Sequence, residues 1–150
     1  MQNTPIEIAF KIILTMLLCG IIGAEREVRN KGAGLRTHIL VGVGSALIVL
    51  TSYFIFDIYK NVTIVDPTRI ISNIVTGIGF LCAGTIIRGG TQHISGLTTA
   101  ATLWVVSGIG MAVGSGFYSA ALIVSFAVFF VLTAVRTMER KIAEKFRDIH

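Results

Sequence analysis

Three polar segments of this sequence carry the side chains that are able to bind a ligand. An acid and a base, Glu25 and Arg26, end the first long apolar run, and Arg36 and Thr37 begin the second. Further along, another basic loop leads into a pair of threonines at the start of a later run. Arginines and helix-start hydroxyls hold anions, lipid head groups or acidic partner segments. The candidate ligand or partner site therefore comprises Glu25, Arg26, Arg36, Thr37, Arg88, Thr98 and Thr99.

A simpler interpretation of the first segment stays open. Glu25 and Arg29 are one helical turn apart, so they can form an ordinary ion pair that anchors a helix at the membrane interface. Because the loop after Glu25 is short, and an unpaired charge at that depth is costly, we also expect Arg36 to approach Glu25.

The residue types argue against enzymatic chemistry. The sequence shows no nucleophile beside a base and no metal-ligand spacing, so we expect neither an enzyme nor a cofactor or metal site. Cys19 and Cys82 lie within apolar runs, where an unpaired thiol behaves as a small hydrophobe. No acid lies near the middle of a run, although magnesium requires oxygen ligands along its path. Transport by a monomer is thus poorly supported, whereas an oligomeric ring of Glu25 carboxylates would provide such ligands.

Five apolar runs must position these residues. Of 150 residues, 53% are hydrophobic and only 14% are charged, against about 25% charged in soluble domains. Runs of about 17 to 20 residues cross a hydrocarbon core of about 30 Å as helices. The sequence therefore predicts an all-α membrane protein with five transmembrane helices. The predicted spans are Ile6 to Ala24, Ile39 to Phe56, Ile70 to Ile87, Leu97 to Val113 and Phe117 to Val135.

The basic residues predict how the chain crosses the bilayer. Ten lysines and arginines fall on one side of the five spans and three on the other, and cytoplasmic loops carry the excess of positive charge. We therefore expect the N-terminus outside and the C-terminus in the cytoplasm, with the candidate site on the cytoplasmic face. The net charge of +5 then serves orientation and contact with anionic lipid, not nucleic acid. Near the outer end, Glu7 and Lys11 are spaced to pair and to reach the interface.

The domain organisation follows from the same pattern. Residues 1–135 form the five-span transmembrane domain, and residues 136–150 form a basic amphipathic helix on the cytoplasmic side. The similar segments Gly34-Leu35-Arg36-Thr37 and Gly96-Leu97-Thr98-Thr99 suggest a 2+2 parallel repeat with one added span.

Small residues at four-residue spacing predict close helix packing. Such pairs allow helix backbones to approach in lipid, where association depends on packing. The pairs are Gly20 and Ala24, Gly42 and Ala46, Gly79 and Ala83, and Gly110 and Gly114. One small bundle does not need all of them, so we expect a homo-oligomer or a membrane partner. The face of Gly110 and Gly114 is the expected oligomer contact, and Gly79 and Ala83 are a further candidate.

Three stretches together resemble the membrane domain of the MgtC/SapB family. They are Gly23-Ala24-Glu25-Arg26-Glu27 with Gly34-Leu35-Arg36-Thr37-His38, then Gly77 to Ile86, then Gly96 to Trp104. The resemblance covers about Gly20 to Tyr118 in order. Cys82 stands where the family pattern usually has glycine, and many members continue into a soluble cytoplasmic domain beyond the point at which this chain ends.

The resemblance implies a bacterial inner-membrane protein linked to growth at low magnesium and, in pathogens, to virulence inside host cells. It also implies regulation of other membrane proteins, with the ATP synthase as a proposed partner, more than magnesium pumping. Our expectation is association with other membrane proteins in magnesium or energy homeostasis. A transporter or channel for magnesium or another small ion is the alternative. The motif residues of the family fall on the same cytoplasmic cluster that the charge pattern indicates.

Overall fold

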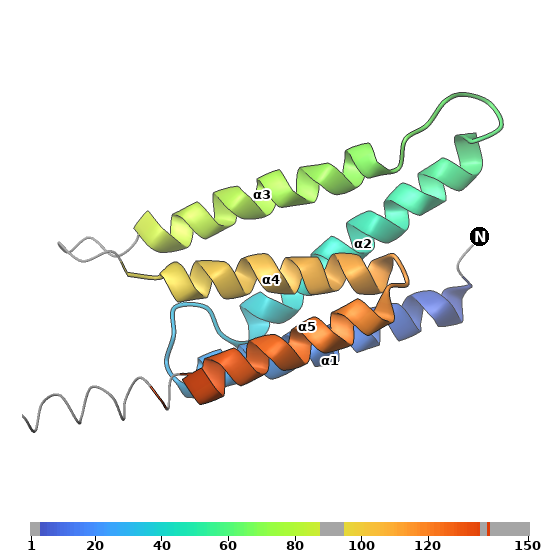
Figure 1. Ribbon diagram of the computed structural model, residues 1–150. Helices are drawn as coiled ribbons and strands as arrows, with labels where there is room; N and C mark the ends of the chain where they lie inside the picture. The colour runs from blue at the N-terminus through green and yellow to red at the C-terminus, as the bar shows by residue number, and fades with distance from the viewer. Residues whose placement is uncertain (1–3, 88–94, 136–137, 139–150) are drawn as a thin grey trace, which may run out of the picture.

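The protein is a bundle of five helices, seen in a computed structural model that describes residues 4–87, 95–135 and 138. The helices run alternately in opposite directions (Figure 1). All five are long and apolar enough to cross a membrane. Each predicted span agrees with its helix to within about one turn at either end, so the five-span fold is confirmed. The helices are α1 (Pro5–Val28), α2 (Leu35–Tyr59), α3 (Thr68–Ile87), α4 (Leu97–Gly114) and α5 (Tyr118–Phe130), and a π-helical turn (Val131–Val135) continues α5.

The start of α1 shows how local sequence sets a helix end. Thr4 and Glu7 form a capping box, in which each side chain bonds the other residue's backbone N–H, at 3.3 and 2.7 Å. Lys11 is 7% exposed, and its Nζ donates to the carbonyl of Gly114 at 3.0 Å. Lys11 is therefore buried against the end of α4, where it caps a carbonyl, and its reach to the membrane interface stays a prediction.

The turns between spans are fixed by short-range hydrogen bonds. Asp66 begins α3 by accepting bonds from the hydroxyl and the N–H of Thr68, at 2.6 and 2.8 Å. These bonds hold the pKa of the Asp66 carboxyl below its usual value. After the C-terminal end of α4, Gly116 adopts φ +82°. The N–H groups of Gly116 and Phe117 bond the carbonyls of Val113 and Ala112. This is a Schellman turn, which requires a left-handed residue.

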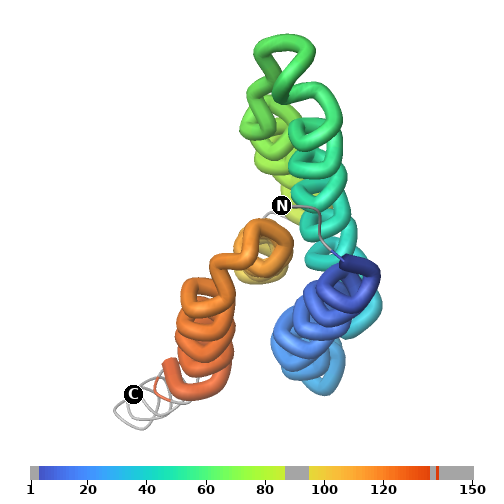
Figure 2. Tube along the Cα trace, turned by 90° about the vertical axis from the view of Figure 1, so that its right-hand side faces the viewer, coloured from blue at the N-terminus to red at the C-terminus, as the bar shows by residue number. Residues whose placement is uncertain are grey.

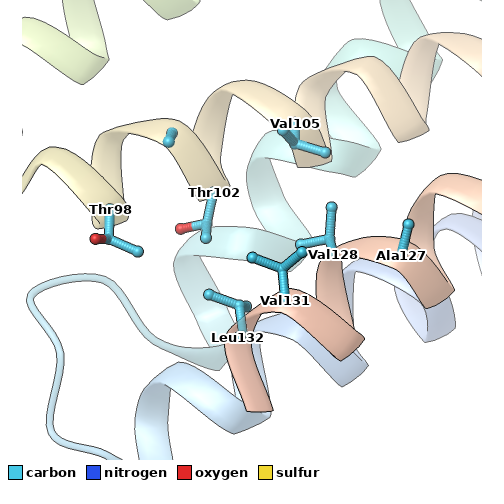
Figure 3. Close-up of a pocket in the computed structure, with 8 residues that line it drawn as sticks. Thr98, Thr102, Val105, Ala127, Val128, Val131 and Leu132 are labelled. Carbon is cyan, nitrogen blue, oxygen red and sulfur yellow. The ribbon is translucent and has the colours of Figure 1, made fainter. Parts of the chain in front are cut away.

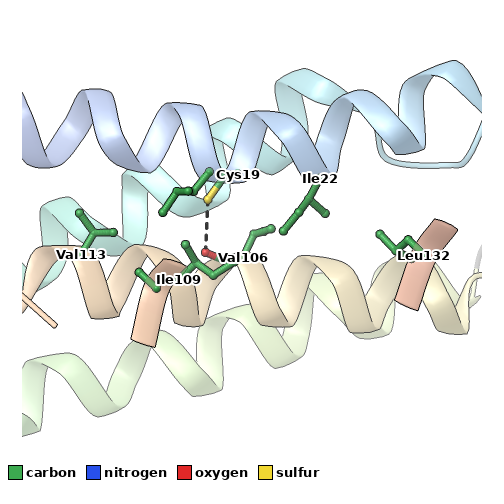
Figure 4. Close-up of a cluster of buried hydrophobic side chains, with 8 residues drawn as sticks. Cys19, Ile22, Val106, Ile109, Val113 and Leu132 are labelled. Atoms are coloured by element: carbon green, nitrogen blue, oxygen red, sulfur yellow. Dashed lines mark hydrogen bonds between the residues drawn. The ribbon is translucent and has the colours of Figure 1, made fainter. Parts of the chain in front are cut away.

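The core lies where α1, α2 and α4 meet. Figure 2 shows α4 in the middle of the bundle, and α4 packs against each of the other four helices. Completely buried apolar side chains such as Ile22, Val106 and Val113 join α1 to α4 (Figure 4). There the thiol of Cys19 donates to the carbonyl of Val106 at 3.7 Å. In contrast, α3 and α5 leave most of their surface exposed.

Glycines set the closest approach between helices. A Cβ on Gly110 would lie 2.1 Å from the carbonyl oxygen of Gly42, and one on Gly114 would lie 3.0 Å from that of Ala46. These glycines of α4 therefore pack against α2 of the same chain. The expectation that this face is spare and binds another protein is wrong, because α2 already occupies it.

The remaining pair of small residues behaves differently. Gly79 and Ala83 are exposed on α3, and a Cβ on Gly79 would meet none of the described residues within 4 Å. The unoccupied small face of this bundle is thus on α3. Gly34 and Gly96 do precede the starts of α2 and α4, but their φ angles are −114° and +87°, and the internal repeat stays a prediction. The amphipathic tail of residues 136–150 lies outside the described residues, apart from Met138.

Candidate functional site

The end of α1 is shaped by its own backbone. Asn30 adopts φ +52°, a left-handed conformation that asparagine tolerates better than most residues. Its N–H bonds the carbonyl of Glu27, and the N–H of Lys31 bonds that of Arg26. This Schellman turn stops α1 and directs the chain toward α2.

Glu27 fixes the start of the next helix. Its Oε2 accepts from the backbone N–H of Leu35, the first residue of α2, at 2.8 Å. A carboxylate at this position satisfies a free N–H and interacts favourably with the positive end of the helix. Gly34 leaves room for this carboxylate, because a Cβ there would overlap it and the Glu27 side chain would have to move. Glu27 therefore holds α1 and α2 together at their charged end.

A buried group of charges lies one turn earlier on α1. The carboxylate of Glu25 forms an ion pair with Arg29 and lies 3.8 Å from Nη1 of Arg26. The side chains of Glu25 and Arg26 are each only 5% exposed. Arg26 also donates from Nη2 to the hydroxyl of Thr99 at 3.2 Å. This bond links the end of α1 to the first turn of α4.

His38 connects the same turn of α4 to α2. Its imidazole is completely buried, with Nδ1 2.8 Å from the carbonyl of Gly34 and Nε2 3.1 Å from the hydroxyl of Thr102. Because a carbonyl only accepts, Nδ1 carries the proton. The Thr102 hydroxyl is also 2.9 Å from the carbonyl of Thr99. α1, α2 and α4 thus share one buried polar network.

The structure brings together only part of the predicted site. Glu25, Arg26 and Thr99 meet in the buried network. Arg36 is exposed and Thr37 half-buried on the first turn of α2. Among the ion pairs of the described residues, Glu25 contacts Arg26 and Arg29 and not Arg36, so the expected approach of Arg36 is not found. Arg88 lies outside the described residues.

Thr98 and Thr99 face different parts of the bundle. Thr98 is exposed and lines a crevice of about 250 Å³ between α4 and α5, together with Thr102, Val128 and Leu132 (Figure 3). Thr99 lines a larger cavity on the opposite side, against α3 and the α1–α2 loop. Because successive helical residues point about 100° apart, these neighbours cannot serve one compact site.

Sequence reasoning did not assign roles to Glu27, His38 and Thr102. The signal for His38 is the buried face of α2, on which His38, Gly42 and Ser45 recur at helical spacing. No comparable signal exists for Glu27, because its capping bond spans a loop whose shape only the folded chain defines. Within residues 4–87 and 95–135, no group of three or more His, Cys, Asp or Glu residues could hold a metal ion.

Five apolar helices with a polar network at one end define a multi-pass helical membrane protein. The sequence model of the MgtC family matches residues 12–141. The chain therefore belongs to the MgtC family, and the resemblance seen in the motifs is confirmed.

Curated relatives show the same relationship. The Escherichia coli K12 protein named "Putative magnesium transporter YhiD" is 43% identical over 141 residues, which are 93% of this chain and 65% of that protein. MgtC of Salmonella typhimurium strain LT2 is 40% identical over 92% of this chain and 54% of its own length. SapB of Bacillus subtilis is 37% identical over 86% of this chain and 55% of its own length. The chain thus spans between about half and two thirds of these relatives. No solved structure matches it.

Proposed function

We propose that this protein acts in the bacterial inner membrane by associating with other membrane proteins, in magnesium or energy homeostasis. Its N-terminus lies outside and its C-terminus in the cytoplasm, so that the Glu25–Arg26–Thr99 network lies at the cytoplasmic face. The observation that carries the proposal is the outer face of α3, which is exposed and unusually rich in small and polar residues.

The outer face of α3 differs from a surface suited to lipid. Asn73, Thr76, Gly79 and Ala83 are all exposed. Neither Asn73 nor Thr76 forms a side-chain hydrogen bond within the described part of the chain. An amide or hydroxyl without a partner in hydrocarbon costs free energy, and small residues allow another helix to approach closely. A second membrane protein, or a second copy of this chain, would satisfy both features.

The interior of the bundle supports association over ion conduction by one chain. Between α1, α2 and α4 the buried side chains are apolar and polar in similar numbers, and the polar ones near the middle are hydroxyls such as those of Ser45 and Ser107, which bond each other at 2.9 Å. The described middle of these helices has no carboxylate, whereas magnesium requires oxygen ligands and loses its water reluctantly. Transport nevertheless remains the second candidate, because the name of the Escherichia coli relative describes magnesium transport.

Photocrosslinking in native membranes tests the association. A photoreactive amino acid at Thr76 should capture a membrane protein, because this side chain faces outward from α3. The matched control is Leu17, which is 60% exposed on the lipid-facing side of α1. A captured partner specific to Thr76 would support the proposal, and mass spectrometry would identify it; the family resemblance makes the ATP synthase a candidate. Equal capture at both positions, or none at Thr76, would contradict the proposal.

Magnesium flux into liposomes tests the second candidate. The purified chain should give no more flux than empty vesicles. Flux that Glu25→Ala abolishes would favour transport through an oligomer and against a purely associative role. Light scattering in mild detergent, on the unmodified chain and on Gly79→Leu, would show whether the α3 face binds a second copy. An oligomer lost only in Gly79→Leu would identify that copy as the partner.

A further inference from the structure

A large cavity lies beside the buried network, at the end of the bundle where α1 stops and α4 begins. Its volume is about 1230 Å³, above the range of about 300–1,000 Å³ for small-molecule pockets. The α1–α2 loop, the last turns of α3 and the first turn of α4 line it. On its α3 side, Phe80 is 85% exposed. The cavity is therefore open toward the surroundings of α3, where the bilayer lies.

One wall of the cavity is apolar. Phe80 and Leu81 of α3 line it together with Ala83, which also belongs to the outer face described above, and Gly77 and Gly84 leave space between them. A Cβ on either glycine would meet no atom of the described residues within 4 Å. This wall suits a hydrocarbon chain that runs along the helix.

The other wall is polar and positively charged. Asn30 and Lys31 of the loop line it, with Ser95 and Thr99 at the start of α4. Lys31 is the one charged side chain among the described lining residues, and none of them is acidic. Directly behind Thr99, the guanidinium of Arg26 donates to its hydroxyl.

The acids at this end of α1 are already engaged. Glu25 forms an ion pair with Arg29, and Glu27 caps the first N–H of α2. At the cavity itself, α4 begins without a side-chain cap, because its N-cap residue is Gly96. The first-turn N–H groups of α4 and the charge of Lys31 therefore favour an anion.

We propose that this cavity binds one anionic phospholipid, with the head-group phosphate at Lys31 and the first turn of α4 and an acyl chain along α3. Free phosphate would share the polar contacts, but it would leave the exposed apolar wall of α3 uncovered. The inference does not rest on the associative function proposed above, because a bound lipid requires neither a protein partner nor ion transport.

Native mass spectrometry of the purified full chain tests the site. The chain is released from detergent containing either phosphatidylglycerol or phosphatidylcholine, with equal acyl chains. We expect one retained phosphatidylglycerol per chain and little phosphatidylcholine. Lys31→Gln should weaken retention about fivefold, the effect of one basic residue near an anionic surface. Lys60→Gln, at the opposite end of the bundle, should leave retention unchanged.

A second pair of variants tests the apolar wall. Gly84→Leu should reduce retention by filling the cavity, whereas Gly79→Leu should not, because Gly79 has equally open space but does not line the cavity. Circular dichroism verifies that all variants are folded. Equal retention of both lipids would overturn the proposal, and so would equal effects of the two leucine variants. Displacement of the lipid by millimolar inorganic phosphate, with no effect of Gly84→Leu, would identify an anion site without a lipid and would also overturn it.

Discussion

Replacing Gly110 by alanine should destabilise the bundle at the crossing of α2 and α4. The added Cβ would lie 2.1 Å from the carbonyl oxygen of Gly42 and 3.1 Å from its Cα. Backbone cannot rotate away as a flexible side chain can, so the two helices must separate by about 1 Å to reach ordinary contact. Such overpacking costs about 1–3 kcal/mol.

The separation would also weaken a polar contact close by. The hydroxyls of Ser45 and Ser107 bond each other across the same crossing at 2.9 Å, and an interhelical hydrogen bond in a membrane protein contributes about 0.6 kcal/mol. Gly108→Ala is the matched control, because a Cβ at Gly108 meets no atom within 4 Å in the described part of the chain. At that position the free energy of unfolding should stay the same or rise by up to about 1 kcal/mol, because alanine has a better helix propensity than glycine. We therefore expect the free energies of unfolding of the two variants to differ by about 1–4 kcal/mol, from overpacking and the weakened hydrogen bond.

The assay is reversible unfolding in mixed detergent micelles, with helical circular dichroism as the readout. Both variants replace glycine by alanine in the same helix, so solubility and helix propensity cancel in the comparison. If Gly110→Ala is as stable as Gly108→Ala, the direct contact of α2 and α4 is refuted. The face of Gly110 would then be free for another protein, as the sequence alone suggested.

Three other outcomes are expected. Glu27→Ala should lower the free energy of unfolding by about 0.5–2 kcal/mol, because α2 loses its N-terminal cap; an unchanged thermal midpoint would contradict this role. Thr99→Val should lower the free energy of unfolding by about 1–3 kcal/mol, because it removes the acceptor of a charged hydrogen bond from Arg26 while keeping the side-chain shape. If denaturant titration shows the same free energy of unfolding, the bond does not stabilise the fold. Reporter fusions after His150 and within the loop at Asn61 should report opposite sides of the membrane, the first cytoplasmic; the same side for both would exclude five spans.

Local sequence determines the existence of the five spans and most of their ends. Long apolar runs force helices, because in hydrocarbon every backbone group must be bonded within its own segment. Short-range signals also determine the caps, since the bonds of Thr4 with Glu7 and of Asp66 with Thr68 join residues only two or three apart. The end of α4 is likewise set locally, by the left-handed glycine Gly116 that follows it.

The candidate site depended on contacts between distant residues. The sequence grouped Thr98 with Thr99, but the rotation of α4 against its neighbours turns Thr99 toward Arg26 and leaves Thr98 in the crevice beside α5. It offered both Arg29 and Arg36 as partners for Glu25, and the structure pairs Glu25 with Arg29, on the same helix. Charge and spacing show which residues lie at the same depth in a membrane. They do not show which way each helix faces.

The small-residue pairs show most clearly what the sequence determines and what the tertiary structure decides. Sequence spacing identified both Gly110 with Gly114 and Gly79 with Ala83 as surfaces for close packing, and it could not distinguish them because the same four-residue spacing serves both uses. Only the tertiary structure decided that α2 covers the pair on α4 while the pair on α3 stays exposed. The physical reason is that each helix can bury only the faces that its neighbours reach. α4 lies among four helices, whereas α3 packs mainly against α2 and α4 among the described helices.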